Sequence, residues 1–272
     1  MQDLQYLEQQ ANEIRILTIK MIGKAKSGHP GGSLSCADLL SALYFDVMNI
    51  DPANPHWADR DRFVMSKGHA CPALYAALAM KGYFDRAELD TLRELGSILQ
   101  GHPYSGKTPG VDVSTGSLGQ GLSIANGIAL GGRLDAKDFY VYCLLGDGEI
   151  EEGQIWEAAM SAAHYGLDHV IAFLDYNHLQ IDGTIEDVIG NVNIPEKFAA
   201  FGWNVLRVNG HDIGQILRAI DEAKACKGRP SIVIMDTVKG KGVSFMENQA
   251  GWHGTAPNAE QVAQALKELG EN

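Results

Sequence analysis

The second half of the chain alternates short apolar runs with amphipathic helical segments, and this alternation constrains its fold more than any other feature. Runs typical of buried strands occupy Phe139–Leu145, Val170–Asp175, Val205–Val208 and Ile232–Met235. The segments around them have helical spacing and predict helices at 119–134, 152–165 and 212–226. Strands joined through helices require right-handed crossovers, which give a parallel sheet. The sequence therefore predicts an α/β fold with a doubly wound, mostly parallel sheet and helices on both faces.

The first half of the chain is predicted to be mainly helical, with one short strand at Arg62–Ser66. Apolar residues at helical spacing predict helices over residues 3–26, 34–48, 70–81 and 85–95. A final helix is expected at 258–269, after a long glycine-rich stretch at 239–258 that we interpret as either functional or disordered. Because no repeat or linker divides the chain, residues 1–272 are expected to form a single domain.

Composition excludes several classes of protein. The chain has 272 residues, of which 45% are hydrophobic and 21% charged, so it can bury a sizeable core. A net charge of −12 argues against nucleic-acid or anionic-membrane partners, which need a positive field. No apolar run reaches about 18 residues, so no membrane span is expected. The four cysteines form no CxxC pair and are expected to be reduced thiols in the cytoplasm.

Polar residues follow two of the predicted strands. Gly146-Asp147-Gly148 comes at the end of one strand, and Asn177 ends the next strand 30 residues later, the length of one strand-helix-strand unit. Ligands of open α/β sheets bind at the carboxyl ends of strands, where these side chains can meet. Magnesium prefers oxygen ligands shared between protein and phosphate, and the start of helix 152–165 offers a further attraction for an anion. The pattern indicates a metal and diphosphate site.

A simpler interpretation exists for each residue alone. Asp-Gly is a common turn dipeptide, and Asn177 could be an ordinary loop residue. The pairing of the two at crossover spacing favours the metal site.

Six short motifs resemble the thiamine-diphosphate-binding domain of transketolases, in the family's order over nearly the whole chain. They are Gly28-His29-Pro30-Gly31, Ser66-Lys67-Gly68-His69, Gly101-His102-Pro103, Gly116-Ser117-Leu118-Gly119-Gln120-Gly121, Gly146-Asp147-Gly148 and Trp252-His253-Gly254. The resemblance implies thiamine diphosphate as cofactor with Mg²⁺, or Ca²⁺ or Mn²⁺, as the metal. The sequence departs from the usual residues of the family at two positions. Ser117 stands where a proline is usual, and Tyr104 stands where an acidic residue is frequent.

The resemblance also assigns roles to residues. It implies that Asp147, Asn177 and the carbonyl of Leu179 bind the metal. Cofactor-binding positions are His69, Gly116, Ser117, Leu118, Asp147, Gly148, Glu149, Asn177 and His253. His29, His102 and His253 would face the reacting sugar, and Glu152 would pair across a subunit interface with the acidic residue that activates the cofactor. Imidazoles suit this chemistry because they donate hydrogen bonds to hydroxyl oxygens and move protons near neutral pH.

Three other groups of residues have competing interpretations. Structural, hydrogen-bonded roles are favoured for His56, His164, His169, His178 and His211. Glu149 and Glu151 are expected to form a solvated acidic first turn of the following helix. Small residues at spacing four could serve internal packing or a subunit interface, and packing is slightly favoured for Gly121, Ala125, Ala129, Ala158 and Ala162.

The implied function is that of the N-terminal subunit of a split transketolase, a transferase active only with a partner. It would transfer a two-carbon ketol unit from a ketose phosphate to an aldose phosphate, as in the pentose phosphate pathway. The partner would be a C-terminal subunit carrying the pyrimidine-binding domain, which this chain is expected to lack, and the assembly a heterotetramer. Alternatives are a related split enzyme for unusual or sulfonated sugars, the 2-oxoacid dehydrogenase or deoxyxylulose-phosphate synthase branches, or a non-catalytic cofactor-binding protein.

Overall fold

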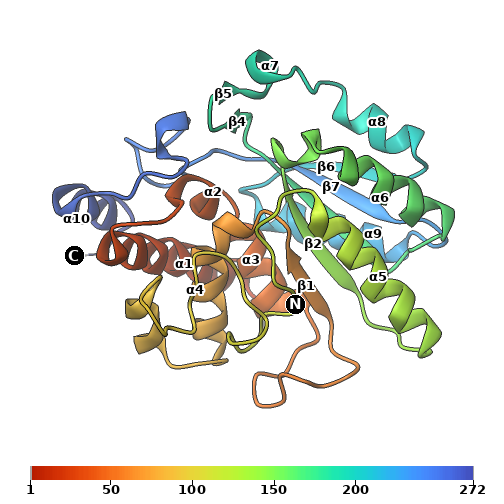
Figure 1. Ribbon diagram of the computed structural model, residues 1–272, viewed down its shortest axis with the longest axis horizontal. Coiled ribbons are helices and arrows are strands. Elements are labelled where there is room, and N and C mark those ends of the chain that lie inside the picture. The colour runs from red at the N-terminus through yellow and green to blue at the C-terminus, as the bar shows by residue number, and fades with distance from the viewer. Residues whose placement is uncertain (1, 272) are drawn as a thin grey trace.

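A five-stranded sheet forms the centre of the computed structural model, which describes residues 2–271 (Figure 1). Its order is β1-β2-β3-β7-β6, and each neighbouring pair is parallel. The strands are β1 (Arg62–Met65), β2 (Val141–Gly146), β3 (Val170–Tyr176), β7 (Ser231–Asp236) and β6 (Asn204–Asn209). The predicted strands are all present, with bounds that differ by one or two residues.

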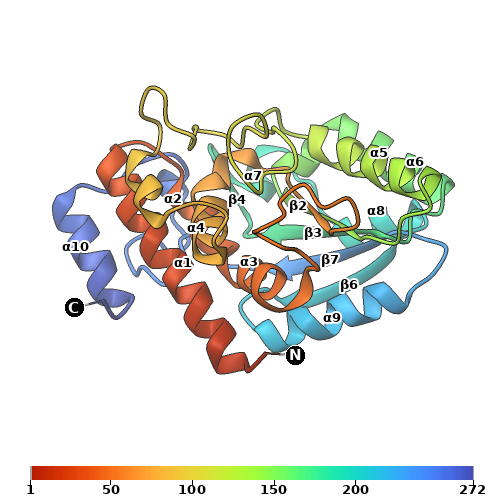
Figure 2. The same ribbon diagram turned by 90° about the horizontal axis from the view of Figure 1, so that it is seen from below.

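Helices cover both faces of this sheet, as Figure 2 shows from below. One face packs against α1 (Leu4–Ala25), α4 (Cys71–Lys81) and α9 (Ile213–Ala225), the other against α5 (Gln120–Leu134) and α6 (Gly153–His164). Successive strand residues point to opposite faces, so Tyr142 and Leu144 join the first core while Val141 and Cys143 join the second. The predicted doubly wound α/β architecture is confirmed.

Two predicted helices differ from those observed. The helix expected at 34–48 is divided into α2 (Pro30–Ser35), α3 (Ala37–Ala42) and a π-helical turn at Leu43–Val47. It begins early because Pro30 suits the first helical turn, and it breaks at Cys36, whose φ of −99° and ψ of 5° are not helical. The helix expected at 85–95 is a 3₁₀ helix, Arg86–Thr91, after which the chain leaves helical geometry.

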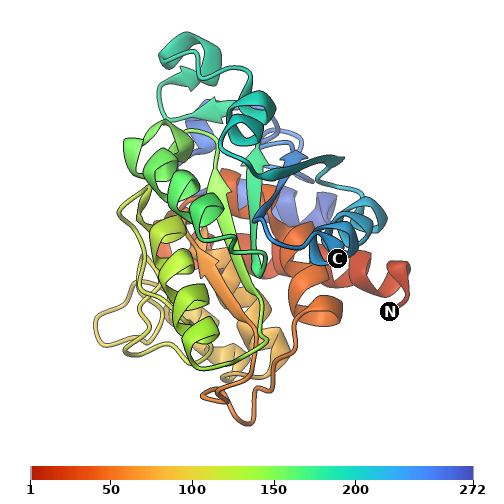
Figure 3. The same cartoon turned by 90° about the vertical axis from the view of Figure 1, so that its right-hand side faces the viewer.

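The segment between β3 and β6 holds short elements that periodicity did not predict. A hairpin of β4 (Leu179–Gln180) and β5 (Gly183–Thr184) is followed by α7 (Ile185–Val188) and α8 (Ile194–Ala200). These elements are too short to show a hydrophobic period. The hairpin and α7 project beyond the carboxyl ends of the strands, at the top of Figure 3.

The C-terminal segment folds onto the N-terminal helix. The last helix, α10 (Ala259–Glu268), contacts α1, and Val243 and Met246 of the preceding loop are buried with residues of both. Of the two interpretations given to residues 239–258, disorder is therefore not the one observed. Among residues 2–271, no helix is long and apolar enough to cross a membrane.

Candidate active site

A cavity of about 330 Å³ opens at the carboxyl ends of β2 and β3. Many of the predicted site residues line it: His69, Leu118, Asp147, Gly148, Glu149, Glu152, Asn177, Leu179 and His253. The predicted residues His29, His102, Gly116 and Ser117 do not line it. All four lie beside lining residues or each other. His29 packs on His69, Ser117 precedes Leu118 in the chain, and a Cβ on Gly116 would lie 3.1 Å from the His102 ring.

The ends of β2 and β3 bring Asp147 and the segment around Asn177 together. Gly146 and Asp175 are paired in the ladder, so the chain after each strand emerges at the same level. The Asp147 carboxylate accepts a hydrogen bond from the backbone N–H of Gly148 at 2.9 Å and another from that of His178 at 2.6 Å. Both Asp147 and Asn177 are buried. The two strand ends therefore lie together, and the predicted meeting of the Asp147 and Asn177 side chains at one metal stays a prediction.

The surroundings of Asp147 favour a bound cation. Burial, followed by the nearby Asp175 carboxylate, raises the pKa of Asp147 to about 7, against the attraction of Lys239. A carboxylate in that setting is stabilised in its charged form when a cation binds. Among residues 2–271 there is no cluster of three or more His, Cys, Asp and Glu side chains that could hold a metal. The predicted set of one carboxylate, one amide oxygen and one carbonyl is of a different kind and suits a hard cation.

Lys239 is a buried cation in this cavity that sequence reasoning missed. Its ammonium donates to the carbonyl of Leu179 at 2.9 Å and lies 3.1 Å from Nδ1 of His253. Burial lowers the pKa of Lys239 to about 8 although Asp147 opposes this shift. The Leu179 carbonyl thus already faces a positive charge. Since an ammonium can only donate, Nδ1 of His253 accepts, and the hydrogen of a neutral His253 lies on Nε2.

Beneath the cavity, Lys67 and Asp175 form a fully buried ion pair. Burial alone would raise the pKa of Asp175, but the Lys67 ammonium and three side-chain hydrogen bonds hold it below its usual range. The Asn177 amide donates to the same carboxylate at 3.4 Å. That bond directs the amide nitrogen of Asn177 towards Asp175, while the amide oxygen accepts from the backbone N–H of Leu179 at 3.2 Å and keeps a second lone pair.

Four histidines from distant parts of the chain gather beside the cavity. The ring centroid of His29 lies 5.2 Å from that of His69, 5.5 Å from that of His253 and 6.4 Å from that of His102. Burial, followed by Arg93, lowers the pKa of His29 to about 4, and burial with Lys239 lowers that of His253 to about 4. The cluster therefore presents neutral imidazoles at neutral pH.

The environment of Glu149 differs from the prediction. It is not part of a solvated first turn, because its side chain is only 2% exposed. Its carboxylate accepts hydrogen bonds from the hydroxyl of Ser66 and from the backbone N–H groups of Gly119 and Gly146. A buried carboxylate at this point ties the glycine loop before α5 to the end of β2. Glu152, in contrast, is exposed at the start of α6 and makes no capping hydrogen bond.

The remaining predictions concern packing and structural histidines. Ala125, Ala129, Ala158 and Ala162 are buried, and a Cβ on Gly121 would lie 2.2 Å from the Ser66 hydroxyl, so internal packing is confirmed for this ridge. A structural role is also confirmed for His211: Nδ1 lies 2.7 Å from the Asp38 carboxylate, and Nε2 accepts from the backbone N–H of Val238 at 2.8 Å. These bonds fasten the loop that carries Lys239.

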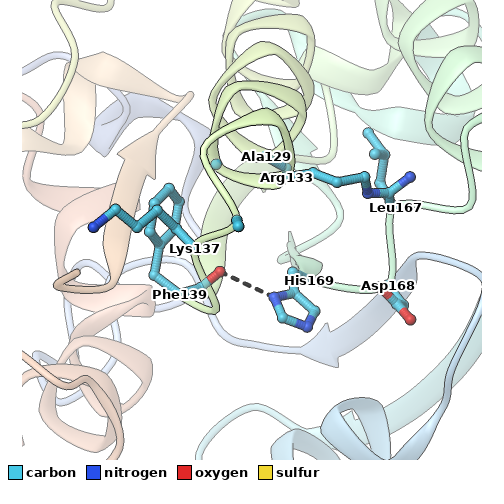
Figure 4. Close-up of a pocket in the computed structure, with 9 residues that line it drawn as sticks. Ala129, Arg133, Lys137, Phe139, Leu167, Asp168 and His169 are labelled. Carbon is cyan, nitrogen blue, oxygen red and sulfur yellow. Dashed lines mark hydrogen bonds between the residues drawn. The ribbon is translucent and has the colours of Figure 1, made fainter. Parts of the chain in front are cut away.

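A second cavity, of about 290 Å³, lies at the opposite end of the sheet (Figure 4). Its polar groups already have partners. Arg133 donates to the carbonyls of Tyr165 and Gly166 at the end of α6, and Nδ1 of His169 lies 3.2 Å from the carbonyl of Phe139. Lys137 pairs with Asp59 at 2.6 Å. The bonds of Arg133 and His169 satisfy carbonyl groups at the end of α6 and before β2. Among the lining residues, we find no buried carboxylate placed like that of Asp147 at a strand end.

The family model of the transketolase thiamine-diphosphate-binding domain matches residues 7–272. The chain belongs to the transketolase family. Two relatives match it over almost their whole length. It is 49% identical to a 6-deoxy-6-sulfo-D-fructose transketolase subunit of Clostridium sp. (strain MSTE9), over 97% of this chain and 96% of that protein. It is 46% identical to one subunit of the apulose-4-phosphate transketolase of Phocaeicola vulgatus, over 97% of this chain and 94% of that protein.

Longer transketolases share the same fold. Human transketolase is 42% identical over 98% of this chain, but the chain spans only 42% of that protein. The crystal structure of Campylobacter jejuni transketolase superposes with a TM-score of 0.93 at 37% identity, covering the whole of this chain and 44% of that one. The transketolase from Leishmania mexicana gives a TM-score of 0.94 at 36% identity, over 98% of this chain and 41% of that one.

Proposed function

We propose that this chain is the diphosphate- and metal-binding subunit of a two-chain transketolase, which transfers a two-carbon ketol unit from a ketose phosphate to an aldose phosphate. The observation that carries the proposal is one cavity at adjoining strand ends. There a buried Asp147 and Asn177 lie within reach of a cluster of neutral histidines. A family member with this arrangement has one place for an anionic cofactor and another for a polar substrate.

Asp147, Asn177 and the Leu179 carbonyl would hold the divalent metal, with magnesium the first choice. The diphosphate would lie against this metal and the Lys239 ammonium. Gly148 supports close approach of an anion at this point, because a Cβ there would lie 3.1 Å from Gln180 and would narrow the cavity. His69, Gly116, Ser117, Leu118, Glu149 and His253 complete the proposed cofactor-binding set, although the contacts of Glu149 make its contribution one of shaping the loop.

Thiamine diphosphate, when bound, supplies a carbon nucleophile and an electron sink. The chain's own histidines would do the remaining work. His29, His102 and His253 are proposed to donate hydrogen bonds to hydroxyl oxygens of the sugar and to move protons there. Neutral imidazoles suit both tasks, because each carries one donor and one acceptor nitrogen.

The partner is proposed to be a C-terminal transketolase subunit that binds the pyrimidine end of the cofactor, in a heterotetramer. Two subunit relatives that match this chain almost end to end support a two-chain enzyme. Residues 1–272 would then act as one diphosphate-binding unit. Glu152 is proposed to pair with the partner's activating acid, and its exposure at the start of α6 is compatible with such a contact. We place the enzyme in the cytoplasm.

The names of the two subunit relatives indicate which sugars to test. The relatives at 49% and 46% identity act, by their names, on 6-deoxy-6-sulfo-D-fructose and on apulose 4-phosphate. These names favour a second candidate, a split enzyme for a sulfonated or unusual sugar, over the pentose phosphate pathway. The ketol-transfer chemistry is the same in both cases.

The experiment is to assay ketol transfer by the purified chain with and without its companion subunit, using thiamine diphosphate and Mg²⁺. A panel of ketose phosphates, sulfofructose and apulose 4-phosphate would serve as donors. Turnover is expected only with both chains. Appreciable turnover by this chain alone would refute the two-chain arrangement. Metal-dependent cofactor binding without turnover in any combination would support a non-catalytic binding protein.

A further inference from the structure

Arg93 stands out among the residues around the histidine cluster. It follows the 3₁₀ helix that ends at Thr91, and its φ of 63° is in the left-handed region, which costs free energy for a residue other than glycine. Its guanidinium donates to the hydroxyl of Ser27 at 2.9 Å and to the carbonyl of Gly101 at 3.4 Å. A Cβ on Gly101 would lie 3.1 Å from this guanidinium, so glycine makes room for it. The strained loop therefore holds a cation in one place.

The same guanidinium lies 3.4 Å from Nδ1 of His29. A guanidinium has donors and no acceptor, so Nδ1 of His29 must accept this bond and carries no hydrogen. A neutral His29 therefore has its hydrogen on Nε2. That nitrogen faces Gly254, where a Cβ would lie 3.6 Å away, so the lack of a side chain leaves this edge of the ring open.

The arrangement repeats one on the other side of the cluster, where the Lys239 ammonium lies against Nδ1 of His253. In both cases a cation meets Nδ1, so the hydrogen of the neutral ring lies on the opposite nitrogen, Nε2. Two cations on two different loops thus act alike on two facing rings, whose centroids are 5.5 Å apart. Burial and the charge of Arg93 together also disfavour a protonated His29.

We propose that Arg93 is a positioning residue that holds His29 as the neutral tautomer with its hydrogen on Nε2, so that His29 donates a hydrogen bond to the bound sugar. The first part concerns this chain alone, and the second part rests on the proposed transketolase function. Arg93 would not touch the substrate. It would determine which ring nitrogen of His29 donates the hydrogen bond. A His29 in the other tautomer would carry its hydrogen on Nδ1 and could not donate from Nε2.

The tautomer can be read directly by two-bond ¹H–¹⁵N correlation spectra of the full chain labelled with ¹⁵N-histidine. His29 would be assigned by its loss in His29→Gln. At pH 7.5 the wild type is expected to show the Nε2–H pattern for His29. Detection of the Nδ1–H tautomer would overturn the proposal, whatever the variants do.

Arg93→Asn removes the guanidinium and keeps a residue that tolerates left-handed backbone. His29 is then expected to show mixed tautomers and a proton affinity raised about tenfold, one pH unit, through loss of the nearby charge. Arg93→Lys keeps the charge but loses the planar fork that reaches Ser27, Gly101 and His29 together. It is expected to keep the proton affinity of His29 low and to restore only part of the tautomer preference. The matched control is Arg86→Asn, at an exposed arginine paired with Glu13. A His29 pattern unchanged in Arg93→Asn would overturn the proposal.

With the companion subunit present, Arg93→Asn is expected to lower kcat at least tenfold with cofactor affinity unchanged. An unchanged kcat would overturn the positioning role. If the wild type itself shows no ketol transfer, the proposed function fails, and the spectra still decide the tautomer.

Discussion

At the scale of single residues, we expect the Lys239 ammonium to attract the diphosphate of the proposed cofactor. The ammonium is buried, and a hydrogen bond to a charged group contributes about 1.5–3 kcal/mol. We therefore expect Lys239→Gln to weaken binding of thiamine diphosphate in the presence of Mg²⁺ by about 10- to 100-fold. Isothermal titration calorimetry would measure the affinity of both proteins for thiamine diphosphate.

Lys241→Gln is the matched control for this prediction. Lys241 lies two residues further along the same loop, but it is partly exposed and pairs with Glu247 at 3.6 Å. Its substitution should leave cofactor affinity within about twofold, since surface ion pairs contribute little. Equal losses in both variants would mean that the net charge of the loop, and not the position of Lys239, controls binding.

The sequence allowed some of these residues to be predicted and not others. Asp147 and Asn177 could be placed because each follows an apolar strand and the crossover length is regular. Lys239 and Arg93 could not, because they lie in irregular segments whose course depends on tertiary contacts. The burial of Glu149 was also missed, since its partners Ser66 and Gly119 are far away in the sequence.

At the scale of elements, the loop that carries Lys239 is fastened by His211. Substitution of His211 by Phe would leave the Val238 N–H without its partner and remove one partner of the Asp38 carboxylate. An unsatisfied buried group costs about 1–3 kcal/mol, so the free energy of unfolding should fall by about that amount or more. Cofactor affinity should fall as well. Urea denaturation and calorimetry would measure the two effects.

His56→Phe is the control for the His211 variant, because His56 is exposed. It should change the free energy of unfolding by no more than about 0.5 kcal/mol. An equally stable His211 variant would show that the loop needs no such fastening.

Two glycines on α5 provide a paired test of packing. A Cβ on Gly121 would lie 2.8 Å from the Ser66 Cα, whereas a Cβ on Gly127 would meet nothing within 4 Å. Gly121→Ala should therefore lower stability by about 1–3 kcal/mol through overpacking. Gly127→Ala should raise it by up to about 1 kcal/mol, since alanine favours helices. Thermal unfolding would measure both, and a stabilised Gly121→Ala would contradict the contact with Ser66.

The same scale shows where periodicity stops being informative. The long helices and the buried strands were predicted to within a few residues because each has enough apolar positions to define a period. Periodicity did not predict the broken helix at 30–47 or the short elements at 179–200. In these segments Pro30, the backbone of Cys36 and the cap at Thr184 decide where elements begin and end.

At the scale of the whole molecule, the neutral histidines make stability depend on pH. The pKa of His29 and of His253 is about 4 in the folded chain, while an unfolded histidine titrates near 6.5. Between these values the unfolded chain binds more protons, so stability is full above about pH 6.5 and falls as the pH decreases towards 4. Urea midpoints at pH 7.5, 6.0 and 5.0 would follow this loss.

The double variant His29→Gln/His253→Gln isolates this contribution from that of the carboxylates. Its stability should depend less steeply on pH between 6.5 and 4 than that of the wild type. Parallel curves for the two proteins would contradict the depressed pKa values.

The α/β architecture was accessible from the sequence because strand-helix alternation leaves few topologies. The sequence did not predict the strand order β3-β7-β6, in which the last strand inserts between two earlier ones. This order depends on how the crossovers pack. This architecture places the ends of β2 and β3 side by side, and the proposed function depends on that placement.

The most direct test is metal-dependent binding of thiamine diphosphate to Asp147→Ala and to the wild type, measured by calorimetry with and without Mg²⁺. Removal of the only carboxylate of the proposed ligand set should abolish the dependence on Mg²⁺ while circular dichroism shows an intact fold. Wild-type affinity with an unchanged Mg²⁺ requirement in Asp147→Ala would contradict the proposal that the two strand ends jointly hold the metal.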